Sequence, residues 1–479
     1  MSQSLSLFAA QVQFLWNSPN EPPDNYNDRL ALIHIPLNLY PFFLQPILQL
    51  IFHDIPPIED IDTDDIDVQD LNISEPTQPA FLNISITPVE CSVVCSRELA
   101  ELYFRPLAEK FNNNEPSRTN HVSISKEDFI VMQVEGQGLD AGQRVLELTS
   151  PLAMAGVSIF FISTYFSDYI LVPRRSRGHV TQALENRGFT FEVSADAFVT
   201  SSSNPQYRSS PPSLDAQRSP PITPPPSTLS ELQTRTFASL RKHNIHARVD
   251  KSLRIVQCAA QYSSSNPSSS STILRPSLVT TLILDNPRFL SLTLTATDPA
   301  ASILLEKRLL PRFSHTTDDH FLTNDSNSNS NLLLGSKDDI LIPIMLDLRD
   351  LPLEATGIVC GVASRLAAAT QSRDATNSSE SENEPENENE NDDVSSIELS
   401  TKGGSGGSKH RSPSELLLKQ QYDRLPADPD SAYTHAVDIS FLSTARAGTV
   451  IVGERELERA MASLEAESRD SSRLEGEGV

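Results

Sequence analysis

Few residues of this chain stand in an arrangement that could carry out catalysis. Residues 403–407, GGSGG, satisfy the G-x-S-x-G pattern of a nucleophilic serine by letter, but low-complexity sequence flanks them, where such a serine needs a preceding strand and a following helix. His315, Asp318, Asp319 and His320 contain metal-binding side chains, yet they lie beside a polar tract that favours a solvated loop. We find no set of nucleophile, base and orienting group. We therefore expect no enzyme, no cofactor and no metal site.

The cysteines favour structural thiols over redox or metal chemistry. The chain has four, at positions 91, 95, 258 and 360. Only Cys91 and Cys95 are close in sequence, and a C-x-x-x-C pair alone is neither a zinc quartet nor a thioredoxin motif. Free cysteine packs as a small apolar residue. We expect all four thiols to be reduced and most of them to be buried.

Charge and hydropathy exclude some classes of partner. The formal net charge is -25, which disfavours nucleic acid or an anionic membrane surface as the main partner. Residues 30–52 are apolar enough to span a membrane by length, but prolines at 36, 41 and 46 would break a spanning helix. We interpret them as a buried strand and a short helix starting near Phe42. With no signal-peptide pattern at the N-terminus, we expect a cytosolic protein.

Several stretches lack the composition of a folded core. Residues 55–79 are acidic and rich in proline, 198–231 form a Ser/Pro linker, and 371–430 contain SSESENEPENENENDD and KGGSGGS. Such sequences bury too little apolar surface to offset the entropy of ordering. We expect a long loop at 55–79, a disordered acidic insertion at 371–430 and a tail at 468–479.

The segment 124–197 has the clearest folding pattern. FIVMQVEG predicts a strand, AGQRVLELTSPLAMAG a helix, VSIFFIS and YILVP two strands, HVTQALENRG a helix and FTFEV a strand. This βαββαβ order is that of the ferredoxin-like fold. We therefore predict the α+β class, built from ferredoxin-like modules.

The same pattern recurs near the C-terminus. SIFFIST at 158–164 aligns with DISFLST at 438–444 at an offset of 280, and VLELTSPLAMAG at 145–156 aligns with VCGVASRLAAAT at 359–370 at an offset of 214. The difference places an insertion in the second copy after Thr370. Duplication with an insertion confined to one loop supports a module formed by residues 339–370 and 431–467.

Two further segments complete a set of four modules. Residues 6–113 contain apolar strands at 30–35 and 80–88 and an amphipathic segment at 98–111. Residues 232–338 contain LRIVQCAAQY, SLVTTLILD and FLSLTLTAT, each of which we interpret as a strand.

The start of the first helix in such a module can bind an anion, because its leading N–H groups have no partner within the helix. The corresponding residues are Gly136–Gly142 in module two and Leu353–Val359 in module four. Two modules side by side could hold a small zwitterion between such a helix end and a facing strand. A helix cap that only packs is the alternative, and the residues alone do not separate the two.

The sequences SPLAMAGVSIFFISTYFSDYILVP, LEATGIVCGVASRLAAA and DISFLST resemble the ACT repeats of the CASTOR proteins, which are cytosolic arginine sensors of the TOR complex 1 pathway. FLNISITPVECSVVCSRELAELYFRPL and SLVTTLILDNPRFLSLTLTAT resemble modules one and three of that family more weakly. The resemblance implies four tandem ACT modules and an amino acid bound between modules two and four. It also implies that the ligand-free protein binds and inhibits a GATOR-like regulatory complex.

The resemblance also implies roles for individual residues. Tyr165 and Asp168 match positions that grip the GATOR partner. The positions that match the ligand site are Ser158, Ile159, Gly357, Ile358, Val359, Ser443 and Thr444.

This chain departs from the family where arginine would be recognised. The acidic residue that pairs with the guanidinium group falls on Gly448, a neighbouring neutral position is Arg446, and the Glu at the helix start falls on Ala355. Guanidinium recognition depends on carboxylates at fixed positions, so we expect that arginine is not the best ligand. The sequence predicts a non-catalytic regulator that binds an amino acid, or a ligand-independent scaffold with a vestigial pocket. Self-association through ACT edges stays open.

Overall fold

The computed structural model describes residues 11–14, 29–52, 81–113, 120–135, 141–191, 226–260, 271–298, 300–313, 333–353, 355–377 and 439–465. The expected loop at 55–79, the linker up to residue 225, the cluster His315–His320, the GGSGG motif and the tail at 468–479 lie outside these residues. The expected disordered insertion at 371–430 lies outside them from residue 378 onward, but residues 371–377 belong instead to the helix Ile358–Asn377. The chain divides into a large unit, Met1–Ala369 with Val437–Val479, and a small one, Thr370–Ala436. The fold of the large unit consists of four modules.

Module one has the strand order β5–β2–β4–β3, which is the order of a ferredoxin-like sheet. Its elements are β2 (Leu30–Ile35), η2 (Tyr40–Phe43), α1 (Leu44–Ile51), β3 (Phe81–Ile86), β4 (Cys91–Ser96), a helix in three parts α2, η3 and α3 (Arg97–Leu99, Ala100–Phe104, Arg105–Asn112), and β5 (Ser123–Ile124).

Module three has the equivalent order β14–β11–β13–β12. Its elements are β11 (Ile255–Ala260), α7 (Ser271–Ile283), β12 (Leu290–Thr295), β13 (Ala301–Glu306), η7 (Lys307–Phe313) and β14 (Leu333–Leu334).

The expected strand SLVTTLILD is wrong, because residues 277–283 belong to α7. Leu274, Leu278 and Leu282 are buried at four-residue spacing, which is the spacing of one helix face. Packing of this face against the sheet overrides the strand preference of the β-branched residues between them.

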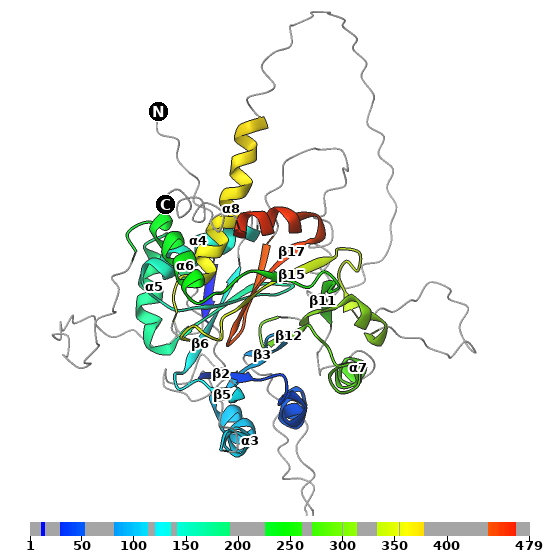
Figure 1. Ribbon diagram of the computed structural model, residues 1–479. Coiled ribbons are helices and arrows are strands. Elements are labelled where there is room, and N and C mark those ends of the chain that lie inside the picture. Colours follow the sequence, from blue (N-terminus) through cyan, green and yellow to red (C-terminus); the bar gives the residue numbers. More distant parts are fainter. Residues whose placement is uncertain are drawn as a thin grey trace, which may run out of the picture. The chain divides into compact units, whose positions relative to one another are not determined.

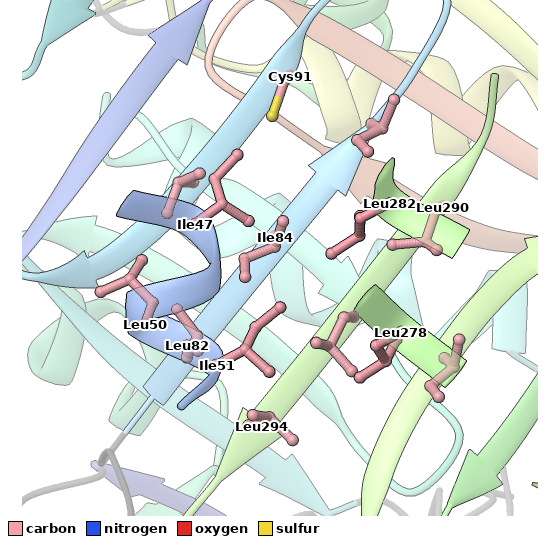
Figure 2. Close-up of a cluster of buried hydrophobic side chains, with 14 of the residues drawn as sticks. Ile47, Leu50, Ile51, Leu82, Ile84, Cys91, Leu278, Leu282, Leu290 and Leu294 are labelled. Carbon is pink, nitrogen blue, oxygen red and sulfur yellow. The ribbon is translucent and has the colours of Figure 1, made fainter. Parts of the chain in front are cut away.

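Modules one and three share one sheet and one core. β3 and β12 pair antiparallel from Phe81–Thr295 to Ile86–Leu290, which joins the two four-stranded sheets. Figure 2 shows leucine and isoleucine side chains of α1 and α7 lying over β3 and β12 in this core. Across the junction, Asn83 Nδ2 donates to Thr293 Oγ1 at 3.0 Å, and the hydroxyls of Ser85 and Ser291 lie 2.9 Å apart. These buried polar pairs favour one register, because a slipped register would leave them unsatisfied.

Modules two and four form the second sheet. The elements of module two are β6 (Phe129–Glu135), α4 (Ala141–Met154), β7 (Phe160–Ser163), β8 (Asp168–Pro173), η5 (Arg174–Ser176), α5 (Arg177–Glu185) and β9 (Thr190–Phe191). Those of module four are β15 (Leu341–Asp347), α8 (Ile358–Asn377), β16 (Ile439–Ser443), β17 (Ala447–Gly453), η8 (Glu454–Glu456) and a helix at 457–465. The two modules meet where Leu442 of β16 pairs with Ile162 of β7.

In modules two and four, the strand next to the first strand of the module comes from another part of the chain. Module two uses the segment that precedes module one, and module four uses the segment that precedes module three. β1 (Gln11–Phe14) pairs with β6 of module two and with β9. α6 (Leu229–Lys242) is followed by β10 (Arg248–Val249), which pairs with β15 of module four. The expected boundaries, 6–113 and 232–338, group these strands with modules one and three instead. β1 and β10 are too short for their sequences to indicate which module they join.

The strand register supports the predicted repeat. Ser163 pairs with Asp168 in one hairpin, and Ser443 pairs with Gly448 in the other. The turns also correspond, because the amide of Thr164 donates to Ser167 O at 3.0 Å and that of Thr444 donates to Ala447 O at 2.9 Å. Each pair is related by the offset of 280 read from the sequence.

The two sheets are joined at their edges, because Leu30 of β2 pairs with Phe129 of β6 and Ile255 of β11 pairs with Leu341 of β15. The strands therefore form one closed barrel, with helices packed on its outer face. In β8, for example, Ile170 and Val172 contact the helices, whereas Tyr169 and Leu171 contact the opposite sheet. This alternation buries both faces and explains the continuous apolar runs of these strands. Figure 1 shows α4, α6 and α8 on one side of the strands and α3 and α7 on the other. Within the described ranges, no helix combines the length and apolar composition needed to cross a membrane.

Candidate functional site

A cavity with a volume of about 60 Å³ lies between modules two and four. Its wall is formed by the end of α4, the start of β7, the loop after β15, the start of α8 and the β16–β17 hairpin. Most of the lining is aliphatic, and the described residues that line it include no charged side chain.

The start of α8 supplies polar backbone groups to this cavity. Gly357 has φ +77, a left-handed conformation that favours glycine, and an added Cβ there would lie 2.7 Å from Leu232 Cδ1 of α6. The amide of Gly361 donates to Gly357 O at 2.8 Å and closes the first turn. The N–H groups of Ile358, Val359 and Cys360 precede that bond, so none has an acceptor within the helix. All three residues line the cavity.

The structure brings most of the sequence-predicted ligand residues together. The members of that set that line the cavity are Ile159, Gly357, Ile358, Val359, Ser443 and Thr444. Ser158 is buried beside Ile159 but does not form part of the wall. Within the described part of the chain, no hydrogen bond is found for the Ser443 hydroxyl. Gly136–Asp140 and Glu354 lie outside the described residues.

The end of β15 and the loop after it contribute Leu346, Leu348 and Leu351, which were not predicted from the sequence. These three residues and Leu353 line the cavity, and we call the segment 348–353 the leucine loop. Gly448 faces them, and an added Cβ there would lie 3.4 Å from Leu348 Cδ1, which is ordinary van der Waals contact. The L-x-L-x-x-L-x-L spacing from residue 346 is a signal that could have indicated an apolar wall.

Arg446 does not line the cavity. Its Nη1 donates to the carbonyl oxygen of Leu351 at 3.2 Å, and the backbone amide of Leu348 donates to the carbonyl of Arg446 at 2.8 Å. The residue therefore ties the leucine loop to the hairpin from outside. From the sequence, we expect the charge of Arg446 to disfavour bound arginine. Because Arg446 is not part of the cavity wall, it would not contact such a ligand directly.

A buried carboxylate, Glu90, connects this hairpin to module one. Glu90 is fully buried, and its Oε1 accepts hydrogen bonds from Thr444 Oγ1 at 2.6 Å and from the amide of Arg446. Its Oε2 lies 2.5 Å from His34 Nδ1. This cluster could not be predicted from the sequence, because His34, Glu90 and Thr444 are far apart along the chain.

The tip of the module-two hairpin contacts module three. The amide of Tyr165 donates to Ser302 Oγ at 2.8 Å, just as that of Ala445 donates to Ser92 Oγ at 3.3 Å. Tyr165 is half-buried. Asp168 is 3% exposed and pairs with Arg144, whose Nε lies 2.6 Å from its Oδ2. The structure therefore does not present Asp168 as a surface contact for the expected partner.

The cysteines match the expectation from sequence, since all four are free and buried. Cys360 lines the cavity, and burial raises the pKa of its thiol to about 11, while a hydrogen bond with Thr149 opposes that shift. Within the described residues, no group of three or more His, Cys, Asp or Glu side chains could hold a metal ion.

Comparisons with known proteins identify one module. The ACT domain family matches residues 124–186, and no curated protein matches. Among solved structures, the protein Atu0741 from Agobacterium tumefaciens is 16% identical with a TM-score of 0.21, covering 38% of this chain and 92% of its own. Aspartate kinase from Synechocystis is 10% identical with a TM-score of 0.26; the match covers 96% of this chain and 55% of the kinase chain.

The family match covers module two, including β6, α4 and the β7–β8 hairpin. The two structural similarities are too low to add to this assignment. Residues 124–186 contain an ACT domain, a type of module that commonly binds amino acids in regulation.

Proposed function

We propose that this protein is a non-catalytic regulator that binds an amino acid between modules two and four. The observation that carries the proposal is the cavity itself. It collects six of the seven residues that the sequence predicted as a ligand site, and it lies against the ACT domain at residues 124–186. We further propose that the protein acts in nutrient signalling through TOR complex 1, controlling a GATOR-like complex from the cytosol.

The start of α8 is suited to the carboxylate of an amino acid. Its N–H groups without a helical acceptor carry a partial positive charge, which stabilises an anion. The cavity is also connected to the rest of the protein, because Thr444 lines it and donates to Glu90 of module one. A ligand that shifts the β16–β17 hairpin would therefore change contacts between modules four and one.

A ligand-independent scaffold is the second candidate. It is favoured by the small volume of the cavity, about 60 Å³, and by the loop bond between Arg446 and Leu351, which holds one wall in place. In this case the cavity would be a packing defect between modules, and partner binding would not respond to amino acids.

A ligand screen with a matched pair of variants separates the two candidates. Thermal melting of the full chain would be measured with each of the standard amino acids at millimolar concentration, then repeated for Gly448→Phe and Gly453→Phe. Both glycines lie in β17, but Gly448 lines the cavity, whereas an added Cβ at Gly453 meets nothing within 4 Å. We expect one or a few amino acids to raise the melting temperature, and Gly448→Phe alone to abolish the effect.

The partner arm of the experiment uses capture of GATOR-type complexes by the immobilised full chain. We expect capture to fall when the stabilising amino acid is added, and to become insensitive to it in Gly448→Phe. If no amino acid changes either the melting temperature or the capture, the sensor proposal fails and the scaffold remains.

A further inference from the structure

We infer that the cavity between modules two and four selects a free amino acid with an aliphatic side chain over one with a charged side chain. This inference rests on the proposed function and adds the chemical class of the ligand. Its basis is the composition of the wall and the location of its polar and apolar parts.

The apolar part of the wall is extensive. The side chains that form it are Val157, Ile159, Phe160, Leu346, Leu348, Leu351, Leu353, Val362, Phe441 and Val450. The polar side chains of the described wall are those of Ser443, Thr444 and Cys360. Thr444 already donates to Glu90 and to the carbonyl of Ala447, and the Cys360 thiol interacts with Thr149.

This wall discriminates strongly against a charged side chain. A buried cation or carboxylate without a partner loses its hydration with nothing in exchange, and the described wall holds no opposite charge. An aliphatic side chain instead gains about 25 cal/mol for each Å² of apolar surface removed from water. The guanidinium group of Arg446 donates to Leu351 O, and Arg446 is not part of the wall.

The polar groups of the wall could bind the α-carboxylate, which all free amino acids share. Ile358, Val359 and Ser443 line the cavity, and the N–H groups of a helix start together with a hydroxyl are suited to a carboxylate. The leucine loop and Gly448 border it as well. Because Gly448 leaves room at ordinary contact distance from Leu348 and Leu346, a side chain added at this position would occupy space next to those leucines.

The experiment uses calorimetric titration of the full chain with leucine, isoleucine, valine, arginine, lysine and glutamate. We expect at least one aliphatic amino acid to bind at least about tenfold more tightly than any charged one, since an apolar wall offers no partner that would offset the desolvation of a charge. Leucinamide, which lacks the carboxylate, should bind about tenfold more weakly than leucine.

Three substitutions at one position test the location. Gly448→Asp places a carboxylate beside the leucines and should weaken the best aliphatic ligand at least about tenfold. Gly448→Asn has the same shape without the charge and should weaken it less, and Gly448→Ala should retain it. Circular dichroism melting of each variant shows whether the protein is folded, and Gly448→Asn preserves the test if the Asp variant is not.

The outcomes distinguish this inference from the proposed function. If arginine or glutamate binds best, the aliphatic assignment is overturned and amino-acid regulation stands. If no amino acid binds, both are overturned. If an aliphatic amino acid binds and all three variants bind it equally, the ligand lies elsewhere and this cavity is not its site.

Discussion

Thr444 Oγ1 donates a hydrogen bond to Glu90 Oε1 at a distance of 2.6 Å, which joins the wall of the cavity to module one. Both residues are buried, and 354 positions separate them in sequence. Among the described residues, the carboxylate also accepts a hydrogen bond from the Arg446 amide and contacts His34. A buried carboxylate persists only where such partners replace water, so the contact fixes the position of the β16–β17 turn relative to module one.

Replacing Thr444 with valine should destabilise the protein. The variant keeps the shape of the side chain but removes one donor from a buried carboxylate, which typically costs about 1–3 kcal/mol. The free energy of unfolding from urea titration would measure the loss. Thr164→Val is the matched control, because Thr164 occupies the equivalent turn and donates to Ser167 O without contacting a carboxylate. An equal loss in both variants would contradict a special role of the Glu90 contact.

The substitution Gly→Ala should lower the stability of the protein in one helix and raise it in another. In α8, a Cβ at Gly361 would lie 2.7 Å from Thr236 Cβ of α6, which is too close for either helix to remain in place. Overpacking of this kind costs about 1–3 kcal/mol. In α5, a Cβ at Gly178 meets nothing within 4 Å, and alanine in an exposed helix is better than glycine by about 0.5–1 kcal/mol.

Urea unfolding of Gly361→Ala and Gly178→Ala would check both signs. The first variant should lower the free energy of unfolding and the second should raise it. If Gly361→Ala were neutral, the close approach of α6 and α8 behind the cavity would be less tight than the structure shows.

Much of this fold could be predicted where the pattern of one segment determines its structure. The βαββ pattern of modules two and four and the repeat offset of 280 follow from local sequence, whereas the grouping of Gly357 with Ser443 rests on the resemblance to the ACT repeats. The helix α7 could not be predicted from β-propensity, because Leu274, Leu278 and Leu282 are buried only when the sheet beneath them exists.

Other features depend on contacts between distant segments. β1 and β10 have four and two residues, so nothing in them specifies a sheet in another module. The contact between Glu90 and Thr444 also joins segments that are far apart in the sequence, so neither segment alone predicts it. Asp168 was predicted at a surface from resemblance alone, whereas the pairing with Arg144 that buries it requires α4 to lie over β8.

The pair formed by Arg144 and Asp168 should respond asymmetrically to substitution. Asp168 is 3% exposed and Arg144 is 27% exposed. Arg144→Met leaves a buried carboxylate without its partner, and we expect a loss of about 3 kcal/mol. Asp168→Asn leaves a guanidinium group that water can reach, so the loss should be smaller. Urea unfolding of both variants and of the double variant would measure the difference.

The same variants address the partner expectation. If capture of the GATOR-type complex falls in proportion to the loss of stability, the role of Asp168 is internal. If Asp168→Asn abolishes capture while leaving the free energy of unfolding unchanged, Asp168 contacts the partner directly, and the buried position described here would have to open.

Stability should decrease in alkaline solution because of the buried thiols. Burial raises the pKa of Cys360 and of Cys258 from 9.0 to about 11 in the folded protein. Above pH 9 the unfolded chain therefore loses these protons while the folded protein retains them, so unfolding becomes easier as the pH rises from 9 towards 11. Each thiol contributes a slope of at most about 1.4 kcal/mol per pH unit in this window, and none of this effect is expected below pH 8.

Urea unfolding at a series of pH values between 7 and 10.5 would measure the decrease, and Cys360→Ala supplies the comparison. The variant loses some packing at every pH, but the slope of its stability above pH 9 should be shallower than that of the unmodified protein, because one titrating group is gone. The intercept reports packing and the slope reports ionisation, so the two effects separate. Parallel slopes in both proteins would show that Cys360 is exposed to solvent, which would in turn contradict the enclosed cavity wall to which it belongs.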